Sequence, residues 1–190
     1  MTTPPPFTTL RRFLPGKLVE RCHLCGAELP PEHAHLLELE HRRIVCSCEA
    51  CGVLFEHRGQ NRYQRIGRDV RYLADFEITD AEWEGLRIPI GLAFFVRTGG
   101  SVKAFYPGPA GCTESRLPFS AAFLPEMEPE VEALLVNRVG AAREYYLAPI
   151  DRCYRLAGLI RMHWRGLSGG EEVWRQIEEF FAPLRGGGHA

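Results

Sequence analysis

The 190-residue chain has little lysine, no excess of charge of either sign and no long apolar run. Its 23 basic and 24 acidic residues give a net charge of −1, so no overall field favours DNA, RNA or an anionic membrane. The longest apolar stretches, such as residues 91–96, are far shorter than the ~20 residues that cross a bilayer. The N-terminus lacks the basic start and apolar segment of a secretory signal. We therefore expect a cytoplasmic protein without a membrane span.

The composition divides the chain into three parts. Apolar residues make up 45% and charged residues 25%, the usual balance of a globular chain. Residues 1–18 are rich in proline and threonine and predict a flexible leader. Residues 19–60 contain five of the seven cysteines and five of the seven histidines, which marks a metal-binding module. Residues 61–186 then form an α+β domain of ordinary composition.

Strand patterns lie in the middle of the α+β domain. Residues 91–96 are continuously apolar and rich in strand formers, which predicts a central strand. A turn at 98–101 and a second apolar segment at 102–106 complete a hairpin. Residues 131–139 and 143–150 form a second strand pair around a glycine-containing turn.

Helix patterns flank these strands. Thr79 and Glu82 have the spacing of a capping box and predict the start of a short helix. Residues 153–164 and 173–184 each place their apolar side chains on one helical stripe. The predicted fold class is therefore α+β, with a small N-terminal module, described next, and an antiparallel sheet packed by a C-terminal helical hairpin.

The strongest chemical signal is a repeated cysteine pattern. Cys22 and Cys25 form one C-x-x-C-G motif, and Cys48 and Cys51 form another, with 22 residues between Cys25 and Cys48. Two residues between cysteines allow a tight turn to direct both sulfurs at one point, and the glycine after each pair permits the positive φ with which the chain leaves the turn. The four cysteines are therefore predicted to form one tetrahedral metal site.

Zinc is the expected metal, with iron as the alternative. A module of ~40 residues buries too little surface to fold alone, whereas a structural zinc ion supplies roughly 10–16 kcal/mol. Disulfides are not expected in a reducing cytosol or with an odd number of cysteines. The motifs resemble zinc ribbons and also rubredoxins, which hold iron in the same two turns. Glu49, where rubredoxins typically have proline, and the short loop between the motifs favour zinc.

Three residues near the motifs are further candidate ligands. Cys46 lies two residues before Cys48, so an extended chain directs both sulfurs to the same face, and Cys46 can replace a ligand or be a spare thiol. His33 and His35 can bind a metal as a pair, although loop histidines are more often solvated. The sequence assigns none of the three.

No catalytic set is predicted. Asp151, His163 and Ser168 have the residue types of a hydrolase triad. On one helix, however, Asp151 and His163 would stand about 18 Å apart. We therefore expect a protein that is not an enzyme.

Two features bear on partners. The window of residues 56–72 carries a charge of +3 and suggests nucleic-acid binding, but arginine outnumbers lysine 21 to 2 throughout the chain and a solvated face explains the window better. Residues 105–111 place an aromatic pair before a proline-bearing turn, which suits a partner surface or a strand end. A protein partner is expected and nucleic acid is not.

Three segments resemble a bacterial family of unknown function, over residues 20–184. They are R-C-H-L-C-G at 21–26, E-P-E-V-E-A-L-L-V-N-R at 128–138 and residues 150–174, which end in R-M-H-W-R-G-L-S-G-G-E-E-V-W. Genes of that family tend to lie beside those of an uptake nickel–iron hydrogenase ([NiFe]-hydrogenase) and its maturation factors. The resemblance implies an accessory role in hydrogenase assembly or electron supply, and it implies no catalytic activity.

These observations predict a non-catalytic metal-binding accessory protein with structural zinc, which interacts with hydrogenase subunits or maturation factors. The first alternative is a rubredoxin-like one-electron carrier with iron in the same site. The second is a nucleic-acid-binding zinc-ribbon protein.

Overall fold

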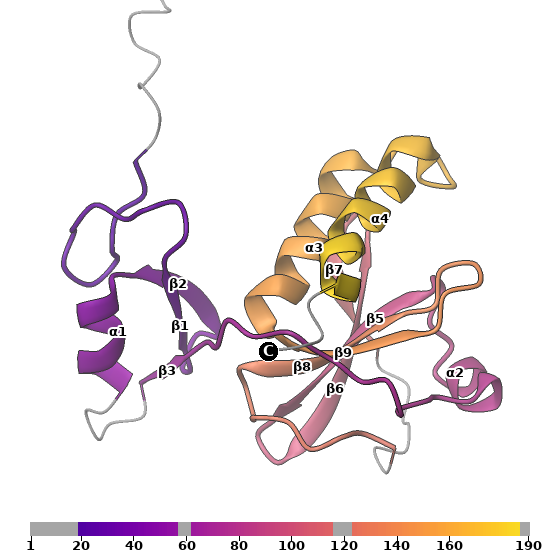
Figure 1. Cartoon of the computed structure of the whole chain (residues 1–190), viewed down its shortest axis with the longest axis horizontal. Helices are drawn as coiled ribbons and strands as arrows, with labels where there is room; N and C mark the ends of the chain where they lie inside the picture. Colours follow the sequence, from indigo (N-terminus) through magenta and orange to yellow (C-terminus); the bar gives the residue numbers. More distant parts are fainter. Residues whose placement is uncertain (1–18, 57–61, 116–122, 187–190) are drawn as a thin grey trace, which may run out of the picture.

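The computed structural model describes residues 19–56, 62–115 and 123–186 (Figure 1). The predicted leader, residues 1–18, lies outside this part of the chain. The described residues form a three-stranded and a six-stranded sheet, and all strand pairs are antiparallel. Two helices at the C-terminal end pack together beside the larger sheet. The predicted α+β class is confirmed.

The smaller sheet belongs to the N-terminal module. Strand β1 (Ala34–Glu38) lies between β2 (Arg43–Ser47) and β3 (Tyr63–Arg65). Helix α1 (Glu49–Glu56) begins almost directly after β2. Because β3 pairs with β1, the sheet of the module continues past residue 60, where the change in composition ends.

The larger sheet has β5 near its centre, as the continuous apolar sequence predicts. Five of the seven residues of β5 in succession, Leu92 to Val96, are buried. The order of strands across the sheet is β4 (Arg71–Tyr72), β9 (Glu144–Pro149), β8 (Glu132–Asn137), β5 (Leu92–Thr98), β6 (Ser101–Gly108) and β7 (Gly111–Glu114).

Both predicted hairpins are present. In the first, Thr98 pairs with Ser101, and the two residues between them, Gly99 and Gly100, have φ of 55° and 77°. Positive φ at both positions gives a turn whose twist matches that of the strands, and glycine adopts it without strain. The second hairpin joins β8 and β9.

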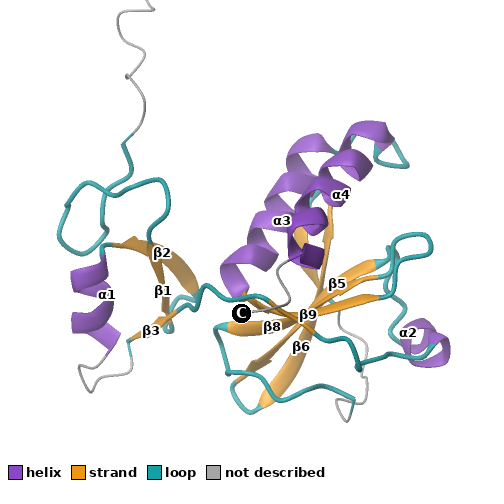
Figure 2. Cartoon of the chain, in the orientation of Figure 1, coloured by secondary structure: helices purple, strands orange, loops and turns teal. Residues whose placement is uncertain are grey.

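The two faces of the larger sheet have separate cores. Helices α3 (Ile150–His163) and α4 (Gly170–Gly186) cover one face (Figure 2). There Phe94 and Tyr146 pack in one cluster with side chains of both helices. On the opposite face, Phe95 and Leu134 pack in a cluster with Ile78 and other residues that precede β5. The central strands are therefore buried from both sides. No helix within the described residues has the length and apolar character needed to cross a membrane.

The short helix α2 (Asp80–Gly85) begins with the predicted capping box. The Thr79 hydroxyl accepts a hydrogen bond from the Glu82 amide, and the Glu82 carboxylate accepts one from the Thr79 amide at 2.8 Å. Two amides at the start of the helix thereby gain partners.

The module shares part of its core with the larger sheet. Leu37 of β1 and Ile66 belong to the same buried cluster as Phe94. A polar contact also joins the module to the rest of the chain, since Arg42 forms an ion pair with Glu130. The module is therefore attached through its sheet, and Cys22 and Cys51 belong to a separate, smaller cluster.

Candidate metal centre

The structure brings the four predicted cysteines together. The sulfurs of Cys22, Cys25, Cys48 and Cys51 all lie within 4.8 Å of one another. The sulfurs of Cys25 and Cys48 are 3.7 Å apart. In a tetrahedral site with metal–sulfur distances of ~2.3 Å, neighbouring sulfurs are about 3.8 Å apart. A disulfide has a separation of ~2.05 Å, so this cluster has the spacing of a metal site.

The first pair lies on a tight turn. The amide of Gly26 donates a hydrogen bond to the Cys22 carbonyl at 2.8 Å, and Gly26 has a φ of 76°. The Cys22 amide donates in turn to the Ala27 carbonyl. The glycine thus reverses the chain after Cys25, as the motif predicts.

The second pair is built differently. Cys48 immediately precedes α1 and Cys51 lies in the first turn of that helix. The amide of Gly52 donates to the Cys48 carbonyl at 2.9 Å, which is the helical pattern, and Gly52 does not have positive φ. The prediction of a glycine turn after both pairs is therefore wrong for the second pair, because the chain continues as a helix and needs no reversal there.

The start of α1 supplies a hydrogen-bond donor to the Cys48 sulfur. The Cys48 sulfur accepts a hydrogen bond from the Cys51 amide at 3.4 Å. Amides in the first turn of a helix have no partner within the helix, and the helix dipole places positive potential there.

The cluster combines one acidic thiol with one that resists ionisation. Burial opposes the ionisation of Cys22, but hydrogen bonds from the backbone of Cys48, Cys25 and Leu24 lower its pKa to about 6. Burial and hydrogen bonds with the neighbouring cysteines raise the pKa of Cys51 to about 12. A cation bound at this cluster would compensate the charge of the thiolates and favour loss of the Cys51 proton.

The apolar core around the cysteines is small. In the described part of the chain it has three buried members, Cys22, Leu29 and Cys51. Leu24 and Phe55 are among the partly buried residues packed against it. Since two of the three buried members are candidate ligands, apolar burial contributes little to this end of the module.

A second group of possible ligands lies nearby. His33, His35 and Cys46 offer ligand atoms that lie within 4.8 Å of one another. His35 and Cys46 are directly opposite each other in the pairing of β1 with β2. The structure thus groups Cys46 with the two histidines, whereas the sequence left it as a spare thiol or a replacement ligand for the four-cysteine site.

The residues of the excluded triad stay apart. Asp151 and His163 lie at opposite ends of α3. Asp151 instead accepts a hydrogen bond from Nδ1 of His35 at 2.8 Å. His163 lies 3.8 Å from Glu172 of α4.

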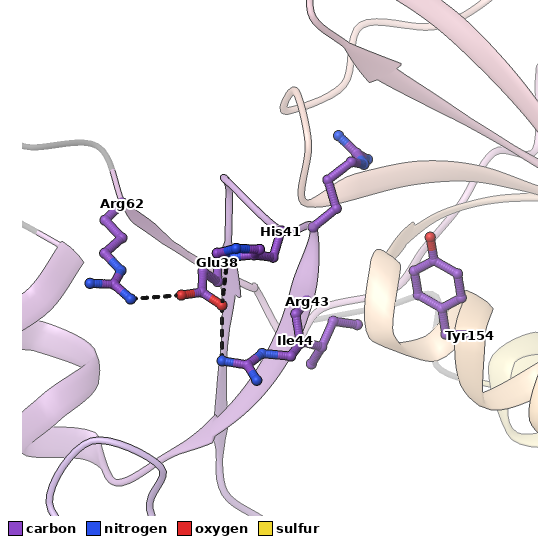
Figure 3. Close-up of a pocket in the computed structure, with 7 residues that line it drawn as sticks. Glu38, His41, Arg43, Ile44, Arg62 and Tyr154 are labelled. Atoms are coloured by element: carbon purple, nitrogen blue, oxygen red, sulfur yellow. Dashed lines mark hydrogen bonds and ion pairs between the residues drawn. The ribbon is translucent and has the colours of Figure 1, made fainter.

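Sequence reasoning missed a buried carboxylate, Glu38, in a cavity of about 770 Å³ between the module and α3 (Figure 3). The Glu38 side chain is 1% exposed and forms ion pairs with Arg62 at 2.9 Å and Arg43 at 3.0 Å. The hydrogen bond from Arg62 is the main cause that lowers the pKa of Glu38. Glu38 is the last of three consecutive buried residues of β1. The sequence signal for this burial was a charged residue that directly follows two leucines.

The arginine-rich window is paired with carboxylates. Arg58 lies outside the described residues. The other four arginines of the window form ion pairs, which are Arg62 with Glu38, Arg65 and Arg68 with Glu49, and Arg71 with Glu132. These pairs neutralise much of the local charge that suggested nucleic acid.

An apolar groove lies beside the helical hairpin. It has a volume of about 670 Å³, and the indoles of Trp164 and Trp174 line it together with Tyr106 and Pro107. Leu167, in the loop between α3 and α4, also lines the groove and is fully exposed. The aromatic and proline-bearing segment noted in the sequence therefore contributes to an open apolar surface.

Comparisons with known proteins give one match. Residues 21–187 match the model of a protein family described as "Family of unknown function (DUF5947)". No curated protein and no solved structure is significantly similar to the chain.

Proposed function

Since the chain belongs to the DUF5947 family, whose function is unknown, we propose a function from its chemistry: it is a metal-binding accessory protein with one structural zinc ion in the four-cysteine site. The observation that carries this proposal is the convergence of four sulfurs within 4.8 Å. Four protein ligands close the coordination sphere of zinc and leave no position for a substrate, which is typical of structural sites.

The small core at this end of the module supports a structural role for the ion. Within the part of the chain that the structure describes, Leu29 is the one buried residue of its cluster that is not a candidate ligand. A bound zinc ion joins the turn before β1 to the start of α1, and its binding energy becomes folding energy of the module.

A one-electron carrier is the alternative for the same site. Its support is the exposure of Cys25, which brings one ligand to the surface. An iron ion there can exchange an electron with a partner through that sulfur. Tetrahedral sulfur ligands accommodate both metals, so the distinction is experimental.

Metal analysis of the full chain, purified without a metal-binding tag, tests both proposals. A colourless protein with zinc supports the structural role. A red protein with one iron that is reversibly reduced supports electron transfer. A protein that folds fully and binds neither metal at the four cysteines overturns both.

We further propose that a cytoplasmic protein partner binds the groove beside the helical hairpin, and that this partner belongs to hydrogenase assembly. The exposed Leu167 and the two indoles support an apolar partner segment. The resemblance to a family encoded near hydrogenase genes supports the choice of partner.

Binding assays with purified hydrogenase subunits and maturation factors test this partner. We expect Leu167→Asp to abolish binding, because a charge enters the groove. Met162→Asp is the matched control, since Met162 is an exposed apolar residue of the same hairpin outside the groove. Equal binding by both variants, or no binding by the unmodified chain, contradicts the proposal. Strong retention on DNA at low salt would instead favour nucleic acid.

A further inference from the structure

We propose that His33, His35 and Cys46 form a second metal site, separate from the four-cysteine site, which binds a divalent ion of the zinc type. The proposal stands independently of the function proposed above. Its first support is proximity, because ligand atoms of the three residues lie within 4.8 Å of one another. They come from β1, β2 and the segment that precedes β1.

His33 supplies the most direct sign of a ligand. Its side chain is 5% exposed. Nδ1 lies 3.0 Å from the Pro30 carbonyl, so Nδ1 carries the proton and donates it to that oxygen. Nε2 is then a lone-pair acceptor, and it is buried without a hydrogen-bond partner. A buried acceptor without a partner is costly, and a metal ion removes that cost.

In His35, as in His33, the Nδ1 nitrogen faces an acceptor oxygen. Its Nδ1 lies 2.8 Å from the Asp151 carboxylate. Asp151 is itself held by a hydrogen bond from the Arg152 amide to its other oxygen, at 2.7 Å. Metal-binding histidines usually donate one ring N–H to a carboxylate or a backbone carbonyl and bind the ion with the other nitrogen. His33 and His35 show both versions of this arrangement.

Cys46 completes the set. It is directly opposite His35 in the strand pairing and partly exposed. Two imidazoles and one thiolate suit zinc and cobalt, which accept both ligand types. Three protein ligands leave one coordination position of a tetrahedral ion for water. His33, His35 and Asp151 also line a cavity of about 260 Å³.

Cobalt titration of the full, reduced chain under anaerobic conditions tests the proposal. Cobalt replaces zinc in both ligand sets and gives absorption bands that depend on the number of thiolates. We expect two cobalt ions per chain, one with a four-thiolate spectrum and one with a weaker, single-thiolate spectrum. Failure of the four-cysteine site would remove only the first spectrum, so the two proposals fail separately.

Variants assign the second ion. We expect Cys46→Ser and His33→Gln to reduce binding to one cobalt per chain and to leave the four-thiolate spectrum intact. Cys112→Ser, which changes an exposed cysteine of β7, should retain both ions. Asp151→Asn removes the charge behind His35 and should weaken the second site about 10- to 100-fold.

Two results overturn the proposal. One is a single cobalt per chain in the unmodified protein, with no change in Cys46→Ser. The other is loss of the four-thiolate spectrum in Cys46→Ser while His33→Gln binds normally, which would make Cys46 a ligand of the first site.

Discussion

The two ends of the molecule are stabilised by different physical means. The six-stranded sheet has large apolar clusters on both faces, with side chains such as Phe94 and Phe95 almost completely buried. The cysteine end of the module has a cluster of three buried residues, and two of these are candidate ligands. One end relies on apolar burial, and the other has a cluster of four cysteines that could hold a metal.

The difference teaches why the module needs the rest of the chain. Its sheet contributes Leu37 to the main core, so one side of the module is stabilised by the larger unit. The other side, with the turn at Gly26 and the start of α1, receives little from that core. The proposed coordination lies where apolar contacts end, and the first two predictions below test this division.

Metal removal should have the largest effect. Structural zinc is worth roughly 10–16 kcal/mol, so a strong chelator should unfold residues 20–30 and α1 while β5 and β8 stay folded. Amide hydrogen exchange measures both regions in one experiment. Cys22→Ser should reproduce the chelator's effect, and Cys112→Ser should not. Protection of α1 that survives complete metal removal would refute the division.

Truncation of the apolar core should destabilise the larger sheet and leave the four-cysteine site intact. Leu134 is fully buried in β8, and Leu134→Ala should lower the unfolding free energy by about 2–5 kcal/mol. The four-cysteine site should keep its metal in the folded protein. Met162→Ala, at an exposed position of α3, should change stability little. Denaturant unfolding and metal analysis measure the two effects, and metal loss in Leu134→Ala would show that the ends are not independent.

Glu38→Gln should change the pH dependence of stability. The arginines hold the pKa of Glu38 below its ordinary value of 4.5, so its stabilising effect is present above that pH and is lost as the pH falls through the lowered pKa. The variant should be less stable than the parent at pH 7, and the difference should shrink in acid. Glu40→Gln, at an exposed neighbour, is the control. A difference that does not depend on pH would contradict the ion pairs.

Removal of the α2 cap should have the smallest effect. Thr79→Ala removes a hydroxyl that accepts a hydrogen bond from the Glu82 amide. Caps of this kind contribute about 1 kcal/mol to the free energy of unfolding. Thr79→Ser keeps the hydroxyl and should retain most of the stability. Thermal unfolding compares the three proteins. Equal losses in both variants would assign the effect to the methyl group.

Local patterns were sufficient for much of the fold. The continuous apolar run of β5, the glycine pair after it and the stripes of α3 and α4 are each read within a few residues, and all are present. The proximity of the two sulfurs within each pair follows from the same kind of short-range rule, whereas the two pairs meet through contacts such as the hydrogen bond from the His23 amide to the Cys46 carbonyl.

Long-range and ambiguous features were not available from the sequence. The hydrogen bond between His35 and Asp151 joins residues 116 positions apart, and no spacing rule connects them. The second cysteine motif fits a turn and a helix start equally well, because glycine is permitted in both and the choice depends on the residues of α1 that follow. The pairing of Arg62 with Glu38 likewise depends on β3 lying beside β1.

The position of Asp151 has a consequence for synthesis. All four cysteines of the first site and all three proposed ligands of the second precede residue 52, whereas Asp151 follows Cys51 by 100 residues. At roughly 5–20 residues per second, the ribosome makes that intervening chain in about 5–20 s. During this interval all four proposed ligands of the first ion are already made, but His35 still lacks the carboxylate that holds its ring. Occupancy of the two sites would therefore follow the order in which the chain emerges.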